Sequence, residues 1–274
     1  MQVKLLGPLS AEASGTSVVP SAGKPRQILA LLAANANQVV PASALMEEVW
    51  GAQLPRSAAT TLQTYILQLR RMLATALGPT APSGAKSVLA TSGGGYLLET
   101  DPDGVDVQRY DRLAEAGHRA ANQGDMCAAA RIYREALAQW RGPAMVDVRT
   151  GPMLEVELVR LEESRLGVIE RRVAADLRLG HHHELLSELV ALTVRYPTNE
   201  GLHGQCMAAL YRSGRQWQAL DVYRSLRSHL VEEFGLEPSA RLRRLHQAVL
   251  AGDPALDYAG EGSGPPARLD LFVA

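Results

Sequence analysis

Apolar residues recur along the chain with two different periods, and the change of period divides the chain in two. In the first hundred residues, short alternating stretches that are typical of strands mix with stretches of helical period. From Asp106 onward the alternation ends, and the helical period continues to about Gly252. The pattern predicts a mixed α+β domain over residues 1–100, an all-α domain over residues 101–252 and a loose tail over residues 253–274.

The first domain is predicted to contain three helices between two pairs of short strands. The helices are Lys24–Asn35, Ala42–Trp50 and Ser57–Leu77. The strands are residues 3–5 with Thr16–Val19, about a turn at Glu12–Gly15, and Ser87–Thr91 with Tyr96–Thr100, about a turn at Ser92–Gly95. We expect Gly51 to end the second helix and Ser57 to cap the third.

The all-α part repeats a helical hairpin. Gly124, Gly180 and Gly214 each precede the second helix of a hairpin, and an alanine and a tyrosine follow the first and last of these glycines at the same distances. The glycines are 56 and 34 residues apart, so an insertion around residues 141–152 separates the first two hairpins. This spacing predicts a tetratricopeptide-like helical repeat domain, in which a small residue and an aromatic residue on the second helix pack against the first.

The helix predicted at Ser57–Leu77 carries two opposed stripes. The apolar stripe, which we expect to be buried, is Leu62, Ile66, Leu69 and Leu73. The polar stripe is Ser57, Thr61, Thr64, Gln68 and Arg71. No acidic residue occurs in this helix. Because Thr and Gln can reach base edges while Arg binds phosphate, the polar stripe is typical of a helix in a DNA major groove. A solvated polar face that happens to lack acids is the alternative.

Charge distribution points to the same part of the chain. Residues 1–96 hold seven basic and three acidic residues, a net charge of +4, whereas the remainder holds 21 basic and 26 acidic residues, a net charge of −5. A basic segment on an acidic body favours a polyanionic partner. No apolar run reaches the roughly 18 residues of a membrane span, so no membrane partner is expected. The two cysteines form no disulfide framework, which favours a cytoplasmic location.

The order of the predicted elements is that of a winged helix-turn-helix domain. In this fold the third helix enters the major groove and the closing hairpin forms the wing. Gly93–Gly95 would let the tip of the wing turn tightly and approach a backbone. Lys24 and Arg26 lie at the positive end of the first helix, where they either bind phosphate or are ordinary surface charges.

Five segments together resemble one family of regulators. The segments PRQILALLAANANQVVPASALMEEVWG, PRSAATTLQTYILQLRRML and TSGGGYLLE resemble the OmpR-type DNA-binding domain of the Streptomyces antibiotic regulatory proteins, the SARP family. DVQRYDRLAEAGHRAANQGDMCAAARIYREALAQWRGPAM and EEFGLEPSARLRRLHQAVLAGDP resemble the bacterial transcriptional activator domain of that family. The resemblance covers residues 1 to about 253. It implies a pathway-specific activator of antibiotic biosynthesis genes, located at the nucleoid.

The resemblance also implies partners and contact residues. Such activators bind direct repeats near the −35 element of double-stranded DNA, pair as homodimers there and recruit RNA polymerase. The loop Gly51–Arg56 would face polymerase, including its sigma and alpha subunits. The implied base-reading residues are Thr61, Thr64, Tyr65 and Gln68. The implied phosphate contacts are Lys24, Arg26, Arg56, Arg70, Arg71, Ser92 and Gly93. Leu67 and Gln68 stand where related helices often carry arginines, so the affinity of each protomer is expected to be low.

The sequence gives little support for a metal site, a phosphate-binding loop or a catalytic site. Consecutive residues on a helix point about 100° apart, so His181–His183 cannot chelate one metal ion together. The chain has no phosphate-binding G-x-x-x-x-G-K-[ST] motif and no nucleophile–base arrangement, so no cofactor and no enzymatic activity are expected. Cys127 and Cys206 are expected to be small core residues. Two functional alternatives stay open: a ligand-dependent repressor, and a helical-repeat scaffold for protein interactions.

Overall fold

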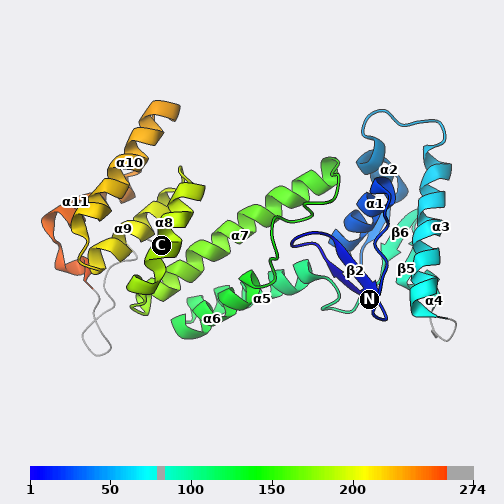
Figure 1. Ribbon diagram of the computed structural model, residues 1–274, viewed down its shortest axis with the longest axis horizontal. Coiled ribbons are helices and arrows are strands. Elements are labelled where there is room, and N and C mark those ends of the chain that lie inside the picture. The colour runs from blue at the N-terminus through cyan, green and yellow to red at the C-terminus, as the bar shows by residue number, and fades with distance from the viewer. Residues whose placement is uncertain (79–83, 258–274) are drawn as a thin grey trace. The chain divides into compact units, whose positions relative to one another are not determined.

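The computed structural model describes residues 1–78 and 84–257, which fall into two compact units (Figure 1). Unit 1 comprises Met1–Glu115 and Glu135–Leu166, and unit 2 comprises Ala116–Arg134 and the described residues from Gly167 onward. The predicted order of a mixed α+β part followed by helices is confirmed. Most of the predicted tail, residues 258–274, lies outside the described residues, as do residues 79–83 of the loop after the third helix.

The winged-helix part of unit 1 contains two small antiparallel sheets and three main helices. The first sheet has the order β1-β2-β3 and consists of β1 (Gln2–Lys4), β2 (Ser10–Ala13) and β3 (Thr16–Ser17). The helices are α1 (Gly23–Ala34), α2 (Ala42–Trp50) and α3 (Ala58–Leu77). The second sheet has the order β4-β6-β5 and consists of β4 (Val39–Pro41), β5 (Leu89–Ser92) and β6 (Gly95–Leu98), with the short helix α4 (Gly84–Val88) before β5. The winged helix-turn-helix fold is thereby confirmed.

Several local predictions for this unit differ from the structure, among them the predicted turn at Ser92–Gly95, whose end residues belong to β5 and β6, and the strand ends at Val18–Val19 and Glu99–Thr100, which lie outside β3 and β6. Glu12 and Ala13 belong to β2, not to a turn, because β2 pairs with both β1 and β3. Val39–Pro41 forms an additional strand paired with β6. Ser87 and Val88 end α4 instead of beginning a strand. Ser57 occupies the N-cap position of α3, but its side chain makes no capping hydrogen bond.

The apolar stripe of α3 is buried as predicted. Leu62, Ile66, Leu69 and Leu73 are at most 2% exposed, and α3 packs against α1 and α2. Burial of each such side chain stabilises the fold by about 1.5–3 kcal/mol. Because this stripe is fixed in the core, the polar side of α3 is held toward solvent.

A buried carboxylate, that of Glu48, joins α2 to the beginning of α7 (Pro152–Arg178). Glu48 is 2% exposed, and its Oε1 accepts hydrogen bonds from the Gln27 amide at 3.0 Å and from the Gly151 N–H at 2.6 Å. Its Oε2 accepts from the N–H groups of Met153 and Leu154, at 2.9 and 3.2 Å. The N–H groups at a helix start have no partner within the helix, so the carboxylate satisfies them and also interacts favourably with the helix dipole.

The predicted insertion is confirmed as the loop between α6 (Met126–Leu137) and α7, and it packs on the connection between β1 and β2. The N–H groups of Arg141 and Met145 donate to the carbonyls of Leu6 and Leu5, at 2.7 and 2.9 Å. The carboxylate of Asp106, the first residue of α5 (Asp106–Asn122), accepts from the N–H groups of Leu5 and Leu6 at 2.7 and 3.0 Å. Burial raises the pKa of Asp106 above its ordinary value.

Unit 2 is built from the predicted helical hairpins. Its elements are the later parts of α5 and α7, most of α6, and α8 (His182–Arg195), α9 (Glu200–Arg212), α10 (Gln216–Phe234), α11 (Ala240–Ala251) and the 3₁₀ turn η1 (Pro254–Leu256). Gly124, Gly180 and Gly214 have φ of +83°, +84° and +73°, and in each case the next helix begins two residues later. Glycine adopts this left-handed conformation without strain, which explains its recurrence at each turn.

The expected packing of small and aromatic residues is also confirmed. Ala129, Tyr133, Ala219 and Tyr223 are buried. A Cβ at Gly117 of α5 would lie 2.5 Å from the ring of Tyr133 on α6, so only glycine allows this close contact. Cys206 is buried as expected, and burial raises the pKa of its thiol to about 11. The corresponding prediction for Cys127 is wrong, because its side chain is exposed.

One member of the histidine triplet, His181, lies beside a buried carboxylate. Asp176, which is 1% exposed, lies 3.4 Å from His181 Nδ1 and 3.4 Å from Arg172 Nη1, and it also pairs with Arg134. His181 therefore helps to satisfy a buried charge at the turn between α7 and α8. Across residues 1–78 and 84–257, no group of three or more His, Cys, Asp or Glu side chains could hold a metal ion, and no helix is both long and apolar enough for a membrane span.

Two glycine substitutions should have opposite effects on stability. Gly117→Ala should lower the free energy of unfolding by about 1–3 kcal/mol, because the added methyl group overlaps the Tyr133 ring. Gly167→Ala, in the middle of α7 with no atom within 4 Å of the new Cβ, should raise it by about 0.5–1 kcal/mol. Urea unfolding monitored by circular dichroism measures both. Equal effects of the two substitutions would contradict the Gly117–Tyr133 contact.

Substitutions of the adjacent acidic residues Glu47 and Glu48 should also have different effects on the free energy of unfolding. Glu48→Ala leaves several buried N–H groups without an acceptor and should lower the free energy of unfolding of unit 1 by about 2–4 kcal/mol. Glu47→Ala, at an exposed position on the same helix, should change it by no more than about 0.5 kcal/mol. Thermal unfolding of both variants provides the comparison, and an unaltered transition for Glu48→Ala would remove the carboxylate from its assigned structural role.

Candidate DNA-binding interface

The polar side of α3 forms the centre of the candidate interface. Thr64 and Arg71 are exposed, and Thr61 and Gln68 are half-buried along the same side of the helix. The Thr64 hydroxyl donates to the carbonyl of Thr60 at 3.0 Å, which leaves its oxygen able to accept a further hydrogen bond. The structure therefore brings the predicted stripe together as one continuous surface.

Tyr65, the fourth predicted base-reading residue, is part of an aromatic stack. Its ring is half-buried and lies parallel to that of Trp50 at the end of α2, with 6.3 Å between ring centroids and 16° between ring planes. The Nζ of Lys24, at the start of α1, lies 5.0 Å from the centroid of the Trp50 ring. A cation over an aromatic face is attracted to the ring quadrupole. This stack therefore connects the three helices at the edge of the polar surface.

Arg70 connects α3 to the wing formed by β5 and β6. Its Nε donates to the carbonyl of Leu89 at 2.9 Å, its Nη2 donates to the Thr91 hydroxyl at 2.8 Å, and its guanidinium lies 6.0 Å from the centroid of the Tyr96 ring. Figure 1 shows α3 beside these two strands. The side chain fixes the position of the wing relative to the helix, and a phosphate contact stays a prediction for it.

The tip of the wing is a tight glycine turn. Ser92 and Gly93 are exposed, and Gly93 and Gly94 have φ of +53° and +77°. Gly95 serves a different purpose, because a Cβ there would lie 2.2 Å from the carbonyl oxygen of Val40 on the adjacent strand. The backbone that Gly95 approaches is therefore that of β4, while Ser92 and Gly93 remain open at the tip.

The remaining basic candidates differ in their surroundings. Arg56 is exposed in the loop between α2 and α3. Arg26 is engaged within unit 1, where its guanidinium donates to the Pro20 carbonyl at 3.1 Å and to the Asp147 carboxylate at 3.1 Å. The phosphate role of Arg26 stays a prediction, and the observed contacts place its charge beside a carboxylate.

Sequence reasoning did not find three residues that support this surface: Glu48, Trp50 and Thr91. Glu48 follows the buried Leu45 by three positions, so helical spacing alone places it on the core side of α2. Trp50 is the last residue of α2, and its stack on Tyr65 has no sequence signal. The Arg70–Thr91 hydrogen bond joins residues 21 positions apart and has no sequence signal.

Comparisons with known proteins agree with both parts of this structure. Residues 16–98 match the family model described as "Transcriptional regulatory protein, C terminal", and residues 105–250 match the model described as "Bacterial transcriptional activator domain". The first match includes α1 to α3 and the wing, and the second includes α5 to α10 and most of α11.

Full-length relatives give the same assignment. Regulatory protein DnrI of Streptomyces peucetius is 54% identical over 260 residues, which cover 95% of this chain and 96% of that protein. Transcriptional regulator RedD of Streptomyces coelicolor is 35% identical over 256 residues, which cover 93% and 72% of the two chains. Among solved structures, Mycobacterium tuberculosis EmbR in complex with a low affinity phosphopeptide is similar with a TM-score of 0.85 and 32% identity; the match covers 92% of this chain and 65% of that chain. The chain therefore belongs to the SARP family of transcriptional activators, with an OmpR-type winged helix followed by a bacterial transcriptional activator domain.

Proposed function

We propose that this activator binds direct repeats near the −35 element of antibiotic biosynthesis promoters as side-by-side protomers, and that it recruits RNA polymerase there. The observation that carries the DNA-binding part is the solvent-facing, acid-free side of α3, which lies next to a wing held by Arg70. Polar side chains on such a face can read base edges without electrostatic repulsion from the phosphates.

In this proposal Thr61, Thr64 and Gln68 read bases. Tyr65 positions α3 through its stack on Trp50 and contacts a base from its free edge. Phosphates are bound by the exposed side chains of Arg56, Lys24 and Arg71 and by the wing tip. Each phosphate that a basic side chain neutralises releases a counterion, so binding should weaken steeply with salt.

Polymerase recruitment is assigned to the loop Gly51–Arg56. Residues 52–56 are exposed, and Leu54 presents an apolar side chain that is 54% exposed. An exposed apolar residue beside a basic one is a suitable contact for a protein partner, here the sigma or alpha subunit. We assign DNA binding to residues 1–100 and pairing of protomers on DNA to residues 101–252.

Footprinting of the purified chain on promoter fragments of its own gene cluster tests the proposal. Sites spaced by one helical turn, about 10–11 bp, or by two turns would put two protomers on one side of the duplex. Protection of evenly spaced repeats beside a −35 element, retained at two salt concentrations, is the expected result. Diffuse binding that disappears at the higher salt concentration would overturn it and favour a protein-interaction scaffold.

Gln68→Ala should reduce sequence preference. If Gln68 contacts a base, its loss should weaken binding to the preferred site by about 1–3 kcal/mol and leave binding to unrelated duplexes nearly unchanged. Gln63→Ala is the matched control, because Gln63 is exposed on the same helix but lies away from the polar stripe. Fluorescence anisotropy with specific and nonspecific duplexes measures the difference. A similar loss on every duplex would mean that Gln68 reads no base.

Substitutions of the adjacent residues Arg70 and Arg71 should have different effects, one on stability and the other on DNA affinity. Arg71→Ala should weaken binding to all duplexes and reduce the slope of log affinity against log salt by about one unit. Arg70→Ala should lower the free energy of unfolding by about 1–3 kcal/mol, because α3 loses its hydrogen bonds to the wing, whereas Arg71→Ala should leave it within about 0.5 kcal/mol. Salt titration and thermal unfolding of both variants test this. An unchanged salt slope for Arg71→Ala would exclude its phosphate contact.

A further inference from the structure

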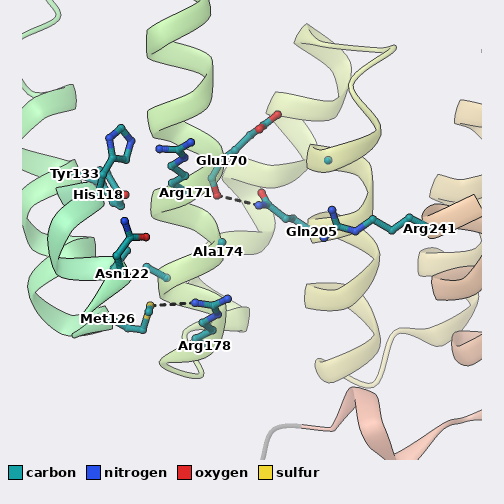
Figure 2. A pocket seen from close by; sticks show the side chains of 13 residues that line it. His118, Asn122, Met126, Tyr133, Glu170, Arg171, Ala174, Arg178, Gln205 and Arg241 are labelled. Atoms are coloured by element: carbon teal, nitrogen blue, oxygen red, sulfur yellow. Dashed lines mark hydrogen bonds between the residues drawn. The ribbon is translucent and has the colours of Figure 1, made fainter. Parts of the chain in front are cut away.

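Unit 2 contains a cavity of about 670 Å³ that the proposed function does not use. Figure 2 shows α7 between the lining side chains of α5 and α6 on one side and those of α9 and α11 on the other. Cavities of this size are in the range that binds small molecules. All of the lining residues belong to unit 2, so the cavity is complete within that unit.

Two buried polar atoms at this cavity have no hydrogen-bond partner among the described residues. Gln205 on α9 is 2% exposed; its Nε2 donates to the carbonyl of Glu170 at 2.9 Å, and its Oε1 is left without a donor. Arg241 on α11 has a buried Nη2 that likewise lacks a partner in the part of the chain described. Figure 2 shows both side chains at the same end of the cavity. Burying such groups unpaired is unfavourable, so a ligand that pairs with them would gain affinity.

The charges of the lining favour an anion. Arg171, Arg178 and Arg241 line the cavity together with one acidic residue, Glu170, and the Glu170 carboxylate already accepts a hydrogen bond from the Asn199 amide at 2.6 Å. Arg171 lies beside the Tyr133 hydroxyl; burial raises the pKa of Tyr133, and the Arg171 charge acts in the opposite direction. The tyrosine therefore stays neutral and able to donate a hydrogen bond.

We propose that this cavity binds a small hydroxylated anion, a carboxylate or a phosphate ester. The anionic group would accept hydrogen bonds from Arg241, which lies beside Gln205 in Figure 2, since guanidinium groups match the geometry of carboxylates and phosphates. Arg171, on the α5–α6 side of the cavity, would attract the anion through its positive charge. A hydroxyl of the ligand would donate to Gln205 Oε1, which supplies the partner that this atom lacks. Small apolar side chains, Ala121, Ala174 and Ala175, leave room for the carbon skeleton.

Calorimetric titration of the full chain with citrate and with ribose 5-phosphate tests the proposal. Citrate is a hydroxylated carboxylate and ribose 5-phosphate a hydroxylated phosphate, so the two probes distinguish the two anionic groups. At least one should bind at a single site, and at ten times its dissociation constant it should raise the Tm of unit 2 by about 3–5 °C. Neutral ribose and sodium chloride at matched ionic strength should have no such effect.

Three substitutions make the test specific. Arg241→Ala should weaken binding of the probe by about 10- to 100-fold, the usual loss for a charge-assisted hydrogen bond. Arg171→Ala removes a positive charge from the lining and should weaken binding by about 2- to 10-fold. Arg243→Ala is the matched control, because it removes an exposed arginine on α11 that does not line this cavity. Arg171 is exposed, so its variant remains informative even if Arg241→Ala unfolds.

The proposal is overturned if neither probe binds, if chloride has the same effect as the probes, or if binding is unchanged in Arg171→Ala. These outcomes are independent of DNA binding, because the cavity lies in unit 2 and the candidate DNA-binding residues lie in unit 1.

Discussion

Burying the Glu48 carboxylate is unfavourable unless other hydrogen bonds replace those to water, and this requirement organises unit 1. Its partners come from α1, from the insertion and from the first turn of α7, so these segments must meet around one side chain. The same contact fixes α2 in the core, and α2 in turn supplies Trp50 against which Tyr65 packs. The orientation of α3 thus depends on a carboxylate that faces away from the candidate DNA-binding surface.

The candidate DNA-binding surface is arranged before any DNA binds. Arg70 holds the wing against α3, and the stack of Lys24, Trp50 and Tyr65 holds the other end of the surface. Side chains that are already immobilised lose little conformational entropy on association. The entropic cost of ordering these supporting side chains is therefore met during folding.

The helices and the fold class could be predicted from the sequence because they depend on the local spacing of apolar residues and glycines. Helical period placed Leu62, Ile66, Leu69 and Leu73 in the core, and the recurrent glycines located the hairpin turns. Short strands such as Val39–Pro41 were missed because three residues carry too little periodicity, and their pairing with β6 is nonlocal. The candidate stripe on α3 was likewise visible from spacing, whereas its supports were not, since Arg70–Thr91 and Glu48–Leu154 join residues far apart in sequence.

The insertion that interrupts the repeat spacing has a consequence for recombination between relatives. Because the Arg26 side chain pairs with Asp147, and the N–H groups of Arg141 and Met145 donate to the carbonyls of Leu6 and Leu5, the winged helix and the insertion pack as one unit. A chimera joined near residue 100, the domain boundary that the sequence pattern predicts, would place a foreign winged helix against this loop. An exchange that carries residues 135–166 along with the first 115 would preserve the packed unit. The folded unit that can be exchanged as a whole between relatives is thus made of two segments that are separate along the chain.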